Sequence, residues 1–93
     1  MPGLISAHEI LPQLDDSWRY DEEKKMIIKD YLLPDFSAAI EFITDIEPLA
    51  QTADHHPDIL LHGYRKVRVM LTTHSAGGVT ENDINLAKAI DAL

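Results

Sequence analysis

Apolar residues recur at strand spacing in several stretches of the chain. In residues 67–73 every second position is apolar or a threonine, which is the period of a strand with one buried face. Residues 26–33 alternate in the same way, with one face imperfect at Asp30. Shorter strands are predicted at 18–21 and 59–62, each followed by a polar turn. The pattern therefore predicts two β-hairpins.

The segment between the two hairpins has the 3.6-residue period of a helix. Asp35 is expected to cap this helix, which should end near Asp54 because Pro57 disfavours helical backbone at the residue before it. Pro48 should kink it. Five apolar side chains form its predicted buried stripe: Phe36, Ile40, Ile43, Ile46 and Ala50.

Two shorter helices are predicted near the ends of the chain. Ser6 with Glu9, and Thr80 with Asp83, have the spacing of capping boxes. The last helix should bury Leu86, Ile90 and Leu93. The element order is then αββαββα. We expect one α+β domain over residues 1–93, a four-stranded antiparallel sheet with helices on one face.

Charge and composition exclude several classes of function. The 93 residues carry 16 Asp and Glu against 8 Lys and Arg, a formal net charge of −8, which disfavours direct binding to nucleic acid or an anionic membrane. The absence of cysteine excludes disulfides and thiolate catalysis. The N-terminus lacks a basic region followed by an apolar run, and no stretch approaches 18 apolar residues, so we expect a cytoplasmic protein.

Candidate chemistry is concentrated in the C-terminal half. His55, His56 and His74 lie in one stretch with Asp83 and without a serine or cysteine nucleophile, which favours acid–base chemistry near neutral pH. Plainer alternatives remain open at this point. The adjacent histidines could bind exposed carbonyls at a helix end, His74 could be a surface residue, and Asp83 could serve only as a capping residue.

A metal site is the weaker interpretation of the same residues. No His-x-His or His-x-x-x-His pair falls on one regular element, and cysteine is absent, so no metal is predicted. The side chains that could have supplied ligands are Asp54, His55, His56, His62 and His74.

The spacing of these residues is similar to a known signature. His55-His56-Pro57, Tyr64, His74 and Asp83 resemble the pattern of the pterin-4a-carbinolamine dehydratases, and the resemblance covers nearly the whole chain. The sequence departs from the family pattern at Gln51, Ala76 and Asn82, and residues 58–63 replace the family's usual aromatic-rich run. The departures bear on affinity and rate more than on the type of reaction.

The resemblance implies dehydration of 4a-hydroxytetrahydropterin to quinonoid dihydropterin, with no metal or organic cofactor. It implies that His55 and His74 share the acid and base roles and that Asp83 orients a histidine. The substrate would be bound by His56, Trp18, Thr73 and Asp54, although Trp18 fits a core tryptophan equally well.

Assembly and partners are a separate expectation from the resemblance. The family forms homodimers and homotetramers, and a small sheet with open edges favours such pairing. Members of the family also act as dimerisation cofactors of transcription factors or as assembly chaperones. A non-catalytic binding module is therefore the alternative function.

Overall fold

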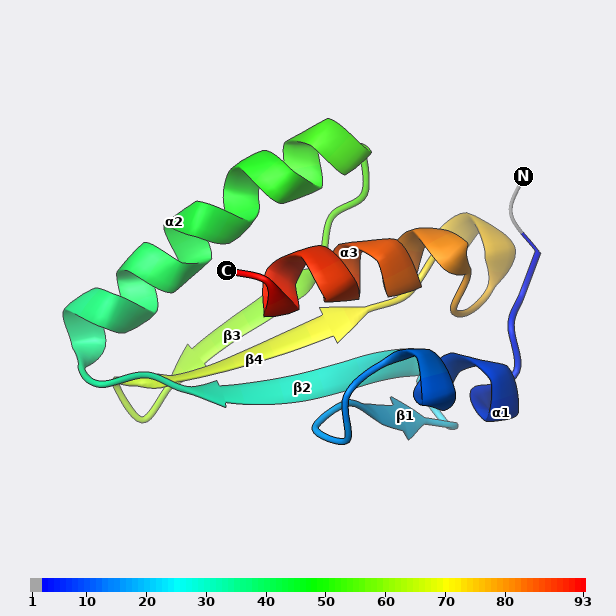
Figure 1. The fold of residues 1–93 in the computed structure, drawn as a ribbon, viewed down its shortest axis with the longest axis horizontal. Coiled ribbons are helices and arrows are strands. Elements are labelled where there is room, and N and C mark those ends of the chain that lie inside the picture. The colour runs from blue at the N-terminus through cyan, green and yellow to red at the C-terminus, as the bar shows by residue number, and fades with distance from the viewer. Residues whose placement is uncertain (1–2) are drawn as a thin grey trace.

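The computed structural model describes residues 3–93 as one four-stranded antiparallel sheet covered by helices on one face, the α+β architecture predicted from the sequence (Figure 1). The elements follow in the order α1 (Ala7–Ile10), β1 (Arg19–Asp21), β2 (Met26–Leu32), α2 (Phe36–Ala53), β3 (Asp58–His62), β4 (Lys66–Leu71) and α3 (Glu81–Asp91). Two short 3₁₀ turns, η1 (Leu11–Gln13) and η2 (His74–Ala76), follow α1 and β4.

The sheet joins the two predicted hairpins through its central strands. Its strand order is β1-β2-β4-β3, so β2 and β4 lie inside and β3 and β1 form the edges. The pairing of β2 with β4 places Ile27 opposite Leu71. The alternation predicted for β4 is confirmed, because Val67, Val69 and Leu71 are fully buried beneath the helices.

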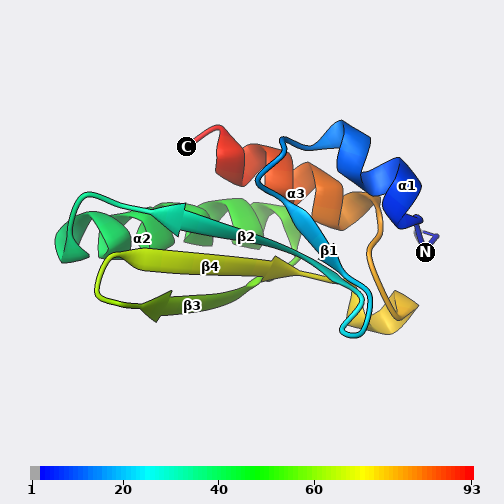
Figure 2. The same cartoon turned by 90° about the horizontal axis from the view of Figure 1, so that it is seen from below.

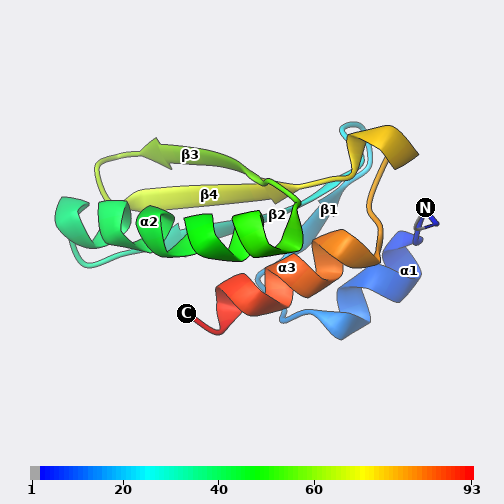
Figure 3. The ribbon, with the colours of Figure 1, turned by 90° about the horizontal axis from the view of Figure 1, so that it is seen from above.

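The helices form the second layer. Figures 2 and 3 show α2 and α3 side by side over the sheet, with α1 beyond α3 and close to β1. The core lies between the two layers and includes Ile10 of α1 and Ile90 of α3. Within the described residues, no helix is both long enough and apolar enough to cross a bilayer.

The long helix α2 differs from its prediction in which side chains it buries. Asp35 caps it as expected, accepting a hydrogen bond of 2.8 Å from the backbone N–H of Ala38, and the helix continues through Pro48. Phe36 and Ile40, predicted to be inward, are 53% and 44% exposed. A helix turns about 100° per residue, so a face centred on the buried alanines and isoleucine leaves those two side chains at its margin. That buried face comprises Ala39, Ile46 and Ala50.

Each of the two terminal helices differs from its prediction in one detail. Ser6 precedes α1, but its hydroxyl bonds the Glu9 carboxylate at 3.2 Å and caps no backbone N–H, so the predicted capping box does not form there. Leu86 and Ile90 of α3 are buried as predicted. Leu93 is 54% exposed, which contradicts the prediction, because α3 ends at Asp91 and the helical period no longer directs the following residues.

Candidate functional site

A buried carboxylate holds one of the predicted histidines. Asp83 has no solvent exposure and lies in the first turn of α3, where its Oδ1 contacts Nε2 of His55. The side chain of His55 is 13% exposed, so the imidazole is largely but not fully buried. A buried carboxylate requires hydrogen-bond donors to offset the loss of solvent. The contact with His55 supplies one of them.

Two threonines complete the environment of Asp83. Its Oδ2 accepts hydrogen bonds from the Thr73 hydroxyl at 2.8 Å and from the backbone N–H of Thr80 at 2.9 Å. The two threonine hydroxyls are 2.9 Å apart, which joins them to each other as well. Asp83 therefore serves both the start of α3, as the sequence predicted, and the imidazole of His55.

The end of α2 directs His55 toward this carboxylate. After Ala53 the backbone enters the left-handed region at Asp54, with φ of 50°, and the helix stops. Asp and Asn tolerate this conformation better than most residues. The backbone N–H of His55 then bonds the carbonyl of Ala50 at 3.1 Å. The reversal at Asp54 thus positions the next residue against α3.

The neighbouring His56 has a different partner. Its Nε2 is 2.9 Å from Oε1 of Gln51, one turn back in α2. Together with Pro57 and Ile59 these residues line a shallow, mainly apolar hollow between α2 and β3. The two adjacent histidines thus have no side-chain partner in common, as expected where successive side chains point in opposite directions. Sequence reasoning noted Gln51 only as a departure from the family signature and did not identify it as the partner of His56.

His74 and Asp54 are both exposed. His74 begins η2, directly after Thr73, so its backbone is adjacent to the residue that bonds Asp83. No hydrogen bond joins its ring to His55 or Asp83 among residues 3–93. The structure therefore brings together His55, Asp83 and Thr73, with His74 next in the chain.

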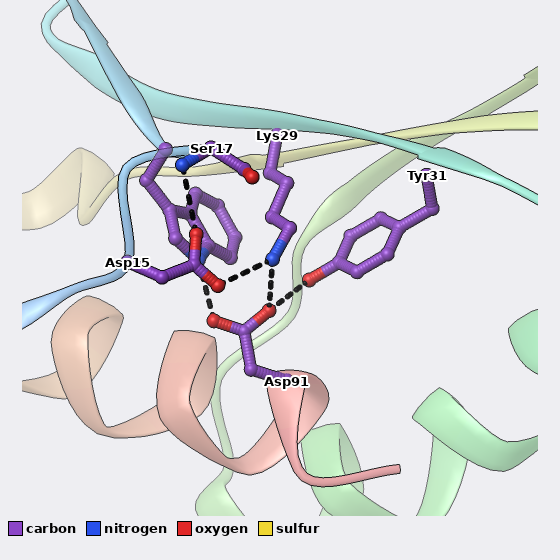
Figure 4. Close-up of polar contacts among 6 residues, drawn as sticks. Asp15, Ser17, Lys29, Tyr31 and Asp91 are labelled. Carbon is purple, nitrogen blue, oxygen red and sulfur yellow. Dashed lines mark hydrogen bonds and ion pairs between the residues drawn. The ribbon is translucent and has the colours of Figure 1, made fainter.

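Trp18 lies in a different polar cluster. It is 3% exposed, and its indole N–H donates a hydrogen bond of 2.8 Å to Oδ2 of Asp91. The other oxygen of Asp91 accepts from Nζ of Lys29 at 2.8 Å and from the hydroxyl of Tyr31 at 2.7 Å (Figure 4). Asp91 is the last residue of α3, where the helix dipole disfavours an anion, so these three donors are what stabilise it.

The contacts within this cluster shift the pKa values of three of its side chains. The hydrogen bond from Lys29 holds the pKa of Asp15 below its ordinary value. Burial opposes the charge on Lys29, but its hydrogen bonds to Asp15 and Asp91 raise its pKa overall. Burial, followed by the bond to Asp91, raises the pKa of Tyr31. The cluster thus favours charged Lys29 and Asp15 with a protonated Tyr31, which is typical of a structural ion-pair network.

Over residues 3–93, no group of three or more His, Asp or Glu side chains has the geometry to hold an ion. His62, the remaining histidine considered as a ligand, lies on β3 with its Nε2 buried and without a hydrogen-bond partner.

Comparisons with known proteins agree with the motif. The family profile described as pterin 4 alpha carbinolamine dehydratase matches residues 4–93. A protein of Chloroflexus aurantiacus named "putative pterin-4-alpha-carbinolamine dehydratase" is 46% identical over 93 residues, covering 100% of this chain and 98% of its own. One of Sulfurisphaera tokodaii with the same name is 39% identical over 89 residues, covering 96% and 95%.

Solved structures share the fold. The transcriptional coactivator/pterin dehydratase of Brucella melitensis has a TM-score of 0.86 and 35% identity, covering 97% of this chain and 96% of its own. A pterin dehydratase-like RuBisCO assembly factor of the alpha-carboxysome has a TM-score of 0.67 at 23% identity, covering 82% and 87%, a likeness of fold alone. With the profile and relatives matching nearly its full length, the chain belongs to the pterin 4 alpha carbinolamine dehydratase family.

Proposed function

We propose that the protein dehydrates 4a-hydroxytetrahydropterin to quinonoid dihydropterin and water. The observation that carries the proposal is the contact between His55 and the buried Asp83, in a chain of this family. A carboxylate that accepts from Nε2 fixes the imidazole tautomer and leaves Nδ1 able to accept a proton. The arrangement is suited to general base catalysis.

The reaction requires one proton acceptor and one proton donor. In the proposed step Nδ1 of His55 takes the proton from a pterin ring nitrogen, and that electron pair forms the new C=N bond as the C4a–O bond breaks. The hydroxyl leaves as water with a proton from His74, which the solvent-exposed turn after β4 presents. The negative charge of Asp83 stabilises the imidazolium that forms on His55. No oxidant, metal or organic cofactor enters the balance.

Binding of the pterin is assigned to residues around these two histidines. His56 is held by Gln51 on the exposed end of α2 and is the proposed positioning contact for the pterin, and Asp54 lies exposed beside it. Trp18 and Thr73 are both buried and bonded to carboxylates, so in this proposal they stabilise the fold and the site and do not touch the substrate.

A direct assay tests the function. The purified protein is added to chemically generated 4a-hydroxytetrahydropterin, and decay of the carbinolamine is followed by its ultraviolet absorbance. The rate should exceed the uncatalysed rate in proportion to protein concentration. D83N should abolish most of this excess, whereas E81Q, which changes an exposed carboxylate in the same helical turn, should retain it. A wild-type protein with no excess rate would refute the proposal.

A homodimer or homotetramer is proposed for the assembly. Within residues 3–93 no strand pairs with the outer edge of β3, and its Leu60 is 46% exposed. Exposed edge strands of this kind favour pairing with another strand, and a two-fold axis lets two copies satisfy each other. Sedimentation at micromolar concentration should show a species of at least two chains. A monomer at that concentration would refute the assembly.

A binding module of the same fold is the second candidate. The observation in its favour is the exposed apolar pair Phe36 and Ile40 on α2, which lies outside the histidine site. One solved relative is named a transcriptional coactivator as well as a pterin dehydratase, and the other a pterin dehydratase-like assembly factor. D83N and H55A change the histidine site, and F36D changes the exposed apolar pair. If D83N and H55A fully replaced the wild-type protein in cells while F36D did not replace it at all, the binding role would replace the enzymatic one.

A further inference from the structure

The side chain of Thr73 makes contacts that its position in the sequence does not predict. It lies just past the end of β4 and is 8% exposed, with its side chain directed into the protein. Its hydroxyl donates to Oδ2 of Asp83 at 2.8 Å and is 2.9 Å from the hydroxyl of Thr80. The side chain is therefore fixed by the carboxylate that holds His55.

The backbone of Thr73 organises the turn that carries His74. Its N–H donates to the carbonyl of Gly78 at 2.8 Å, and the two residues form an isolated β-bridge. Its carbonyl accepts from the amides of Ala76 at 3.0 Å, Gly77 at 3.0 Å and Gly78 at 3.3 Å. Four backbone contacts of one residue thus close the whole turn.

We infer that Thr73 is a positioning residue that sets His74 relative to His55. Asp83 touches His55 directly and reaches the His74 turn through the Thr73 hydroxyl. The two histidines are thereby fixed relative to one buried group, although they come from loops at the ends of α2 and β4. The inference rests on the proposed function for its catalytic consequence, but the positioning itself is a property of the fold.

The alternative is a buried threonine that only fills space. Valine is nearly the same shape and lacks the hydroxyl, so T73V separates the two roles. Thr72 supplies a matched control, because its hydroxyl donates to the carbonyl of Lys25 at 2.7 Å, in the turn between β1 and β2. T72V therefore removes one hydroxyl bond at the adjacent residue without touching Asp83.

The first measurement is hydrogen exchange, which does not depend on catalysis. A hydrogen bond to a carboxylate is among the stronger ones, so T73V should speed amide exchange at residues 76–78 by about tenfold or more. T72V should leave exchange at these amides unchanged, and T73S, which keeps the hydroxyl, should restore it. Nitrogen-15 chemical shifts of the His55 ring should change with T73V alone. If T73V proves unfolded by circular dichroism, T73A against T73S gives the same comparison.

The second measurement is turnover. T73V should lower kcat by about tenfold or more with little change in KM, since small displacements of reacting groups are costly and the substrate contacts remain. If wild type itself shows no dehydration, the proposed function fails while the exchange and ring measurements still decide the positioning. If T73V matches T72V in exchange and in the His55 ring shifts, the inference is overturned.

Discussion

Asp83 and His55 lie 28 positions apart in the sequence, and their side chains meet in a carboxylate–imidazole contact at the start of α3. D83N preserves the shape of the side chain but removes its charge. We expect kcat to fall by about 10²-fold or more, because the amide no longer stabilises an imidazolium. Steady-state kinetics of D83N and of the control E81Q check this. Equal activity of the two variants would contradict the role assigned to Asp83.

The two proposed proton-transfer residues should each be needed. H55A and H74A are expected to lower kcat by about 10²-fold or more, the usual loss when a general acid or base is removed. His8 and His62 provide controls, since H8A and H62Q alter histidines in α1 and β3 without changing the Asp83 environment. Full activity in both H55A and H74A would contradict the proposed acid–base mechanism.

His56 should affect binding more than chemistry. Its ring is held by Gln51 and not by Asp83, so H56A is expected to raise KM by about tenfold while kcat changes little. Q51A should produce a smaller change in the same direction, because it frees the ring without removing it. Initial rates over a range of substrate concentrations separate the two constants. A fall in kcat without a change in KM would assign His56 to the chemical step instead.

We expect a substitution in the polar cluster around Asp91 to destabilise the fold more than a substitution of an exposed polar residue. D91N leaves Lys29, Tyr31 and Trp18 with a weaker acceptor, so we expect a loss of about 1–3 kcal/mol in the free energy of unfolding. Urea unfolding followed by Trp18 fluorescence measures it. D16N, at an exposed aspartate, should change stability by less than about 0.5 kcal/mol. A D91N protein as stable as wild type would show that the network is dispensable.

The same cluster predicts how stability depends on pH. The pKa of Tyr31 is raised above its ordinary value of 10.0 by burial and then by its bond to Asp91, so the folded state retains the proton longer than the unfolded state. Its contribution to stability is therefore complete below pH 10 and is lost as the pH rises beyond it. The Y31F variant should therefore lose less stability than the wild-type protein as the pH rises above 10. Urea midpoints between pH 8 and pH 11 test the difference.

At acidic pH the dependence of stability on pH has the opposite sign, and Asp15 is its source. The pKa of Asp15 is lowered from 3.8, first by its hydrogen bond to Lys29, so ionised Asp15 favours the folded state. This contribution is present above pH 3.8 and is lost as the pH falls toward the lower folded value. Because Asp15 is mostly exposed, solvent screening keeps the effect small. D15N should reduce the slope of stability against pH in this range.

Local patterns predicted most of the fold, most clearly at β4, where burial alternates along the strand. The alternation of Val67, Val69 and Leu71 identified β4 and its buried face, and Asp35 marked the start of α2. The errors arose where apolar character alone was used to infer burial. Phe36 and Ile40 are large and apolar yet exposed, whereas the small Ala39 is fully buried. Side-chain size does not determine which face of a helix meets the sheet.

Polar partners were less predictable because they are set by the tertiary fold. Lys29 lies on the helix-covered side of β2, opposite Val69, whereas the sequence analysis noted an interruption only at Asp30 on the other face. Its partners Asp15 and Asp91 come from the segment before β1 and the end of α3. The sequence analysis assigned Thr73 to substrate binding, whereas its bond to Asp83 depends on how the start of α3 lies against the end of β4.

The capping role of Asp83 has a consequence for how the proposed activity is lost on heating. One carboxylate closes the first turn of α3 through the N–H of Thr80 and holds His55 through its other oxygen. Fraying of that turn would release the imidazole in the same event, because both contacts depend on one side chain. Thr80, Asp83 and Ile84 are fully buried, so this turn should open only together with the core around it. The proposed activity should therefore be lost at the same temperature as the tertiary structure, without an earlier step of local inactivation.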